Sequence, residues 1–182
     1  MSLSDTPPSI VVTARSLDPA ANEKIAGKGI DVTTVADNRW GRVDIKSVAL
    51  LPNVLAKQAA RERGAREAWF VDRDGRVTEG SSSNAWIITH DGKVVTRPAD
   101  HAILRGITRT VLLDAIRAHE LTLEERAFTV EEAYAAREAF VTSASQIVVP
   151  VVRIDGKPVG NGAPGAVAMA LRREFHRFAE SL

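Results

Sequence analysis

Lys46 is the first residue in the sequence whose position suggests chemistry. It follows Val43, Asp44 and Ile45, a stretch typical of a strand, and it precedes Pro52, which suits the first turn of a helix. The sequence therefore predicts that Lys46 lies where a strand gives way to a helix, a common position for functional side chains. Alternation along the strand places Asp44 and Lys46 on the face opposite Val43 and Ile45. Such a lysine is either a solvated charge or, when desolvated, a nucleophile or base.

A second polar group occupies the sequence VTEGSSSNAW, which runs from Val77 to Trp86. Glu79 ends one predicted strand, and a loop containing Ser82 and Ser83 leads to the next. In this arrangement the carboxylate could face a cationic nitrogen while the serines orient an anion or ring substituents. The same composition also suits a plain polar loop whose hydroxyl groups cap its own backbone.

Two further segments offer unpaired backbone N–H groups, which are donors that bind phosphate. In ILRGITRT, Gly106 precedes a predicted helix that opens with Ile107 and Thr108, and the N-terminal end of a helix attracts anions. In FVTSAS, Ser143 and Ala144 follow a predicted strand. Each segment alone is also typical of an ordinary turn. Together the four groups supply a lysine for an aldehyde, a carboxylate for a ring nitrogen and two anion sites, which are the groups that pyridoxal 5'-phosphate requires.

The elements that must position these residues are a mixture of strands, hairpins and helices. Turn signals at Asp74–Gly75 and Asp91–Gly92 predict two β-hairpins, and a capping box of Thr129 and Glu132 predicts a helix start. Pro150 suggests an edge strand or a bulge in the last hairpin. Strands are expected over 9–14, 29–36 and 138–145, hairpins over 67–80, 84–98 and 147–160, and helices over 18–27, 51–64, 106–120, 129–136 and 165–181. This order describes an α+β domain rather than a regular βαβ winding.

Composition restricts the class of protein. The length of 182 residues suits one compact domain, and 24 basic against 23 acidic residues give no charge surplus of the kind that nucleic-acid binders carry. The absence of cysteine excludes disulfides, thiolate zinc sites and thiol catalysis. The four histidines are far apart and show no metal-ligand spacing, so no metal site is predicted.

From the sequence we expect neither a secretory signal nor a membrane-spanning segment. The longest apolar run, Ile147–Val152, is far too short to cross a bilayer, and the first residues lack a basic region followed by an apolar stretch. We therefore expect a soluble cytoplasmic protein that binds neither membranes nor nucleic acid.

The motifs, taken in order, resemble those of the fold type IV enzymes that depend on pyridoxal 5'-phosphate (class IV aminotransferases), most closely the bacterial D-amino acid transaminases. The matching stretches are RWGRVDIKSVALLPNVLAKQAA, VTEGSSSNAW, ILRGITR and FVTSAS, and the similarity covers nearly all of residues 9–178. The resemblance implies that Lys46 binds the cofactor covalently and then serves as the base that moves a proton. It also implies that Glu79 pairs with the pyridine nitrogen and that Arg39 lies close to the lysine, where its charge could lower the pKa of the amine.

The resemblance further assigns the remaining contacts to the cofactor. Leu104 would pack on the ring, and Ser82 and Ser83 match loop positions near the cofactor. The phosphate would be held, largely through backbone N–H groups, by Ile107, Thr108, Ser143 and Ala144. This chain departs from the family pattern at Ala144, where the family has a second hydroxyl residue, so one side-chain contact to the phosphate is expected to be missing.

A second departure concerns domain organisation. The family places a smaller N-terminal domain before this region, and we expect this chain to lack it. Residues 1–8 are expected to be a tail or a remnant of cloning, and residues 9–182 a single large domain that binds pyridoxal 5'-phosphate. The resemblance thus predicts an aminotransferase that acts on an amino acid and a 2-keto acid as a homodimer, with low or no activity in this fragment. Branched-chain aminotransferase and aminodeoxychorismate lyase are alternatives within the family, and an idle interaction domain that retains an ancestral site is an alternative outside it.

Overall fold

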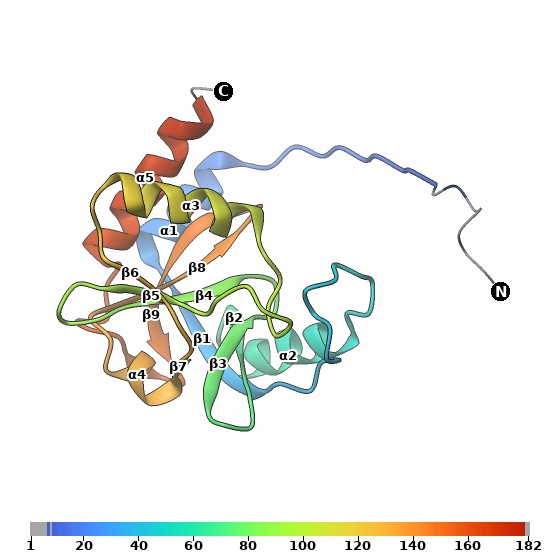
Figure 1. Cartoon of the computed structure of the whole chain (residues 1–182), viewed down its shortest axis with the longest axis horizontal. Helices are drawn as coiled ribbons and strands as arrows, with labels where there is room; N and C mark the ends of the chain where they lie inside the picture. The colour runs from blue at the N-terminus through green and yellow to red at the C-terminus, as the bar shows by residue number, and fades with distance from the viewer. Residues whose placement is uncertain (1–6, 8, 181–182) are drawn as a thin grey trace.

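The structure is a computed structural model that describes Pro7 and residues 9–180. Strands and helices are mixed in it as the sequence predicts, and the fold is α+β (Figure 1). The helices are α1 (Pro19–Lys28), α2 (Leu51–Glu62), α3 (Ile107–Ala118), α4 (Val130–Tyr134) and α5 (Ala166–Glu180). The strands are β1 (Ile30–Ala36), β2 (Glu67–Val71), β3 (Arg76–Gly80), β4 (Asn84–Ile88), β5 (Val94–Thr96), β6 (Leu123–Glu125), β7 (Phe128–Thr129), β8 (Glu138–Ser143), β9 (Ile147–Ile154) and β10 (Lys157–Pro158).

The described strands form one mixed sheet. Its order is β6-β5-β4-β8-β9-β1-β2-β3-β7, and β10 pairs with β9 outside this path. Strand β1 runs parallel to both of its neighbours, β2 and β9, whereas the hairpin partners are antiparallel. Helices α3 and α5 lie together over β8 and β9, and α2 packs on β2 (Figure 1).

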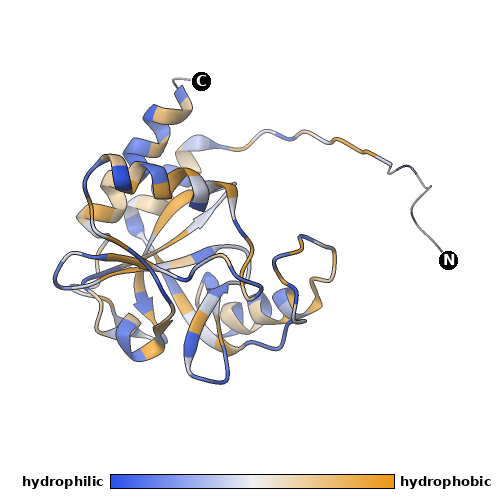
Figure 2. Cartoon of the chain, viewed as in Figure 1, coloured by the Kyte–Doolittle hydropathy of each residue, from blue (hydrophilic) through white to orange (hydrophobic). Residues whose placement is uncertain are grey.

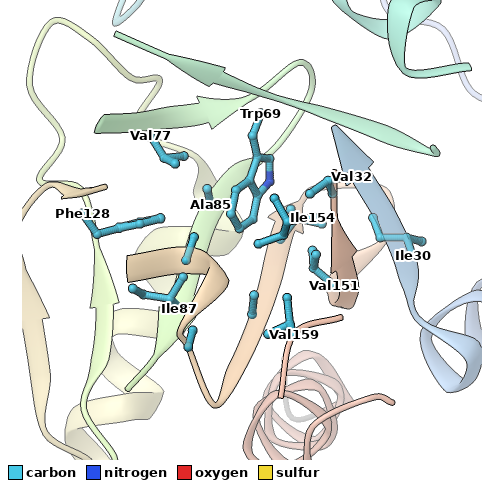
Figure 3. Close-up of a cluster of buried hydrophobic side chains, with 14 of the residues drawn as sticks. Ile30, Val32, Trp69, Val77, Ala85, Ile87, Phe128, Val151, Ile154 and Val159 are labelled. Carbon is cyan, nitrogen blue, oxygen red and sulfur yellow. The ribbon is translucent and has the colours of Figure 1, made fainter. Parts of the chain in front are cut away.

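Three clusters of buried apolar side chains hold these layers together. The largest surrounds Trp69 of β2 and includes Val32 of β1, Ala85 of β4 and Ile154 of β9 (Figure 3). A second cluster lies under α3 and α5, and a small one of alanines and Phe70 lies under α2. Burial of apolar area at about 25 cal/mol per Å² makes these clusters the main source of stability.

Local sequence signals account for most element boundaries. Asp18 caps α1 by accepting a hydrogen bond from the N–H of Ala20, at 2.9 Å, and the capping box of Thr129 and Glu132 opens α4. Gly75 and Gly92 have positive φ angles in the two predicted hairpin turns. None of the helices in the described part of the chain has the length and apolar character that a membrane crossing requires.

Several expectations were wrong. Residues 9–14 are not a strand, and they are exposed without regular structure, because no strand in the described chain pairs with them. Helix α1 continues past Gly27 and ends at Lys28, with Gly29 as the C-cap at a φ of 73°. The short strands β6 and β7 were missed, since three and two residues give no periodic signal.

Pro150 does not mark an edge. It lies within β9, a strand with neighbours on both sides, and pairs with Phe140 of β8. On the other side, the pairing of β1 with β9 starts at Val151 and shifts register after its first pair. The register shift skips Val152, two residues after the proline, so β9 is irregular near Pro150 but not at it.

Candidate active site

A cleft of about 1210 Å³ opens between the loop before α2, the serine loop after β3, the start of α3 and the turn after β8. Every site residue predicted from the sequence lines this cleft. They are Arg39, Lys46, Glu79, Ser82, Ser83, Leu104, Gly106, Ile107, Thr108, Ser143 and Ala144. Segments separated by up to about a hundred residues therefore meet at one place, although their individual roles stay predictions.

Lys46 lies in the irregular loop that joins β1 to α2, not at the end of a strand. Residues Val43 and Asp44 form a turn, and their apolar and polar side chains do not alternate across a sheet. The N–H of Val43 donates to the carbonyl oxygen of His101 at 3.2 Å, which holds this loop against the segment that leads to α3. The side chain of Lys46 is exposed at the wall of the cleft. The predicted strand is thus wrong, but the lysine still faces the cleft.

Glu79 is the buried carboxylate of the cleft, with only 6% of its surface exposed. Its Oε2 atom accepts hydrogen bonds from the Asn84 amide at 3.1 Å and from the N–H of Leu104 at 3.0 Å. Its Oε1 atom accepts a hydrogen bond from Arg39. Burial raises the pKa of Glu79 to about 7, although the charge and hydrogen bonds of Arg39 act in the opposite direction.

Arg39 is buried between two carboxylates. It donates to Asp37 at 2.7 Å and to Glu79, and its guanidinium lies 4.4 Å from the centre of the Phe70 ring. Burial raises the pKa of Asp37, but hydrogen bonds and the charge of Arg39 outweigh it and lower the pKa. Asp37 therefore stays ionised while Glu79 titrates near neutrality. The charge of Arg39 is balanced by these partners, so its effect on Lys46 stays a prediction.

The serine loop is fixed by a residue that no sequence motif singles out. Glu67, at the start of β2 and 4% exposed, accepts hydrogen bonds from the hydroxyl groups of Ser81, Ser82 and Ser83. Lys57 of α2 forms an ion pair with the same carboxylate at 3.2 Å. Ser82 and Ser83 line the cleft, and their hydroxyl groups donate to Glu67 in this structure, so their contact with a cofactor stays a prediction.

Backbone donors face the cleft from two directions. The first N–H groups of α3, at Ile107 and Thr108, have no intrahelical acceptor, and Gly106 provides no side-chain cap. In the turn after β8, the N–H groups of Ala144 and Ser145 have no acceptor among the described residues, while the N–H of Gln146 donates to the Ser143 hydroxyl oxygen at 3.3 Å. Unpaired donors from a helix start and a turn form a suitable site for a dianionic phosphate.

Gly106 is needed for packing against Asn84. A Cβ atom added at Gly106 would overlap Asn84 Oδ1. Asn84 in turn donates to the carbonyl oxygen of Leu104 at 2.8 Å and to Glu79. The glycine therefore lets one asparagine connect the start of α3 to the buried carboxylate.

Sequence reasoning missed four residues that support the cleft. Asn84 lies within the motif VTEGSSSNAW. Its position five residues after Glu79, across a tight loop, was the signal that could have indicated contact between the two side chains. Asn53, whose amide donates to the carbonyl oxygen of Ser81 at 2.9 Å, and Lys57 lie one helical turn apart on α2. Glu67 opens an otherwise apolar strand and carried no signal at all.

Comparison with known proteins identifies the family. The pattern of the family described as amino-transferase class IV matches residues 2–154. The chain belongs to the class IV aminotransferase family. This membership agrees with the resemblance carried by the four motifs.

Curated relatives in this family are D-alanine aminotransferases. The protein from Bacillus licheniformis is 44% identical over 154 residues, which cover 85% of this chain and 54% of the relative. The protein from Staphylococcus haemolyticus is 42% identical over 174 residues, which cover 96% of this chain and 60% of the relative. This class IV chain therefore spans little more than half the length of the relatives that it matches.

Solved structures of class IV enzymes share its fold. The branched-chain amino acid aminotransferase of Escherichia coli aligns with a TM-score of 0.77 and 26% identity, over 84% of this chain and 52% of the other. The corresponding T.th. enzyme, solved with pyridoxamine 5'-phosphate, aligns with a TM-score of 0.76 and 29% identity, over 84% of this chain and 51% of the other. These alignments support the fold type IV assignment.

Proposed function

We propose that this chain is the cofactor-binding large domain of a transaminase that uses pyridoxal 5'-phosphate and acts on D-amino acids. The observation that supports this most directly is the convergence of Lys46, Glu79, the start of α3 and the turn after β8 on one cleft. The sequence identity to D-alanine aminotransferases exceeds that to the branched-chain enzymes, which favours a D-amino acid as the amino donor.

The donors and acceptors of the cleft fit this cofactor. Glu79 accepts three hydrogen bonds, which leaves one acceptor position of its carboxylate for a protonated ring nitrogen. The N–H groups of Ile107, Thr108 and Ala144 suit the phosphate, and Ala144 contributes no hydroxyl group to it. When bound, the cofactor supplies a ring that accepts the electrons released when the substrate loses its α-proton.

The side chains of the chain itself then have separate tasks. Lys46 provides the amine that holds the cofactor aldehyde, and once released it carries the proton that leaves the substrate α-carbon. Glu79 keeps the ring nitrogen protonated, and Arg39 and Asn84 orient Glu79. The loop of Ser82 and Ser83, anchored on Glu67, closes one wall of the site.

The rest of the proposal concerns the whole protein. We propose that its substrates are an amino acid and a 2-keto acid and that it acts in the cytoplasm as a homodimer. The small N-terminal domain of the family would supply further contacts to the phosphate and to the substrate carboxylate. This chain alone is therefore expected to bind the cofactor weakly and to show little turnover.

Titration with pyridoxal 5'-phosphate, followed by borohydride reduction and peptide mapping, tests the proposal. We expect a yellow species and a reduced adduct on Lys46, no adduct in Lys46→Ala, and an adduct of normal position in Glu79→Gln. Lys57→Ala is the matched control, because Lys57 is the other lysine of the cleft. An adduct on Lys57, or an equal yield in Lys46→Ala, would refute the assignment. No colour at saturating cofactor would favour the idle interaction domain.

A further inference from the structure

Ile147, the first residue of β9, has an unusual backbone conformation at the edge of the candidate phosphate site. Its φ angle is 65°, in the left-handed region. A β-branched side chain is disfavoured there, and glycine is the usual residue at this position of a short hairpin loop. Ile147 pairs with Ser143 and therefore closes the turn of Ala144, Ser145 and Gln146. Something outside the turn must maintain this conformation.

Arg172 of α5 supplies that constraint. One of its terminal nitrogens, Nη1, donates to the carbonyl oxygens of Gln146 and Val148, at 2.6 and 2.7 Å. These two carbonyl groups flank Ile147. The arginine side chain is 2% exposed, so both hydrogen bonds are shielded from water.

Helix α1 contributes contacts to both Arg172 and the turn. Glu23 accepts from Nη2 of Arg172 at 2.6 Å and also contacts Nε, which fixes the plane of the guanidinium. Asn22, the preceding residue, donates its amide to the carbonyl oxygen of Ser145 at 3.0 Å. Helices α1 and α5 thus hold the carbonyl groups of Ser145 and Gln146 within the turn and of Val148 just after it.

We propose that Arg172 is a positioning residue that fixes the Ser143–Ile147 turn, so that the N–H groups of Ala144 and Ser145 stay free at the cleft wall to bind the cofactor phosphate. This inference rests on the proposed function, in which the turn receives the phosphate. It assigns Arg172 no contact with the cofactor. Asn22 and Arg172 donate to the carbonyl oxygens of Ser145 and Gln146. The N–H groups of Ala144 and Ser145 have no acceptor among the described residues, so they can bind an anion.

The conformation of the turn can be tested without any cofactor, by measuring the φ-dependent backbone coupling of Ile147 by NMR. We expect Ile147 to leave the left-handed region in Arg172→Gln and to keep it in Arg173→Gln, the exposed neighbour on the same helix. An unchanged coupling in a folded Arg172→Gln variant would overturn the proposal. If that variant does not fold, Glu23→Ala, which removes the exposed carboxylate that fixes the guanidinium of Arg172, must change the coupling of Ile147, and the proposal is wrong if it does not.

The link to the phosphate is tested by comparing the affinities of pyridoxal 5'-phosphate and pyridoxal. We expect Arg172→Gln to weaken pyridoxal 5'-phosphate at least tenfold and pyridoxal less than twofold, with no change in Arg173→Gln. Adding Ile147→Gly to Arg172→Gln should restore most of the lost affinity, because glycine adopts a positive φ without restraint. Equal loss for both ligands, or no rescue by glycine, would mean that Arg172 acts only on general stability. If the unaltered chain binds neither ligand, the proposed function fails while the NMR result still decides the role of Arg172 in the turn.

Discussion

Glu79 shows how one side chain can combine burial with a titration near neutral pH. Its pKa rises from 4.5 to about 7 in the folded chain, chiefly because it is buried. Between these values the unfolded chain has released this proton, whereas the folded chain still holds it. Folding therefore takes up a proton, and the free energy of unfolding must fall as the pH rises through this window.

The prediction is that Glu79→Gln removes this pH dependence. Its magnitude in the unaltered chain is of the order of 3 kcal/mol, at about 1.4 kcal/mol for each pKa unit. Urea unfolding at intervals between pH 4.5 and 7.5 measures it, and a glutamine cannot titrate, so the variant should show a flatter curve. Glu180→Gln, at an exposed position on α5, makes the same change of side chain and should retain the slope. Parallel curves for Glu79→Gln and the unaltered chain would contradict the prediction.

For single residues, the sequence indicated which side chains come together better than it indicated their hydrogen-bond partners. The motifs selected Lys46, Glu79 and the N–H donors at the start of α3 and in the turn after β8. All of these residues line the cleft. Glu67 could not be found, because a single acidic residue at the start of an apolar strand has many uses. Its role depends on three serines brought against it by a hairpin, and no local pattern contains that information.

The N-terminal end of α5 is capped by a carboxylate from the sheet. Glu138, the first residue of β8, accepts hydrogen bonds from the N–H groups of Val167 and Ala168, at 3.2 and 3.0 Å. These are among the first residues of α5, whose N–H groups have no intrahelical acceptor. A Cβ atom at Gly165 would overlap the Glu138 side chain, so the glycine makes room for this cap.

We therefore expect Glu138→Ala to destabilise the chain by about 1–2 kcal/mol, the usual cost of losing an N-terminal cap. Glu138→Gln, which retains one acceptor oxygen, should cost less. Chemical unfolding measures both, and Glu180→Ala at the other end of α5 should change stability by no more than about 0.5 kcal/mol. If Glu138→Ala were as stable as that control, the cap would not contribute.

Elements were predictable where a local signal sufficed. Caps and turn glycines located α1, α4 and both central hairpins, because those signals act within a few residues. Residues 9–14 have strand propensity but no described strand to pair with, and propensity alone does not form a strand. In α2, the large apolar residues Leu51, Val54 and Leu55 are exposed, and the helix packs through Ala56 and Ala60, since small residues let it approach β2 closely.

At the scale of the whole molecule, α2 presents an exposed apolar face. Leu51 and Leu55 lie one turn apart and are 69% and 55% exposed. Val48 and Leu50, in the preceding loop, are exposed next to them in sequence, and this loop projects from the body of the fold with apolar residues along it (Figure 2). An apolar surface of this kind is typical of a contact with another protein or domain.

We expect the chain to self-associate through this face as its concentration rises. The double variant Leu51→Lys and Leu55→Lys should shift sedimentation velocity profiles toward the monomer, because two charges cannot be buried against the same surface without cost. Stability should change little, since lysine has nearly the helix propensity of leucine and both positions are exposed. Ile10→Lys, which changes an exposed apolar residue away from α2, is the control. If it reduces association as strongly as the double variant, the contact is not specific to α2.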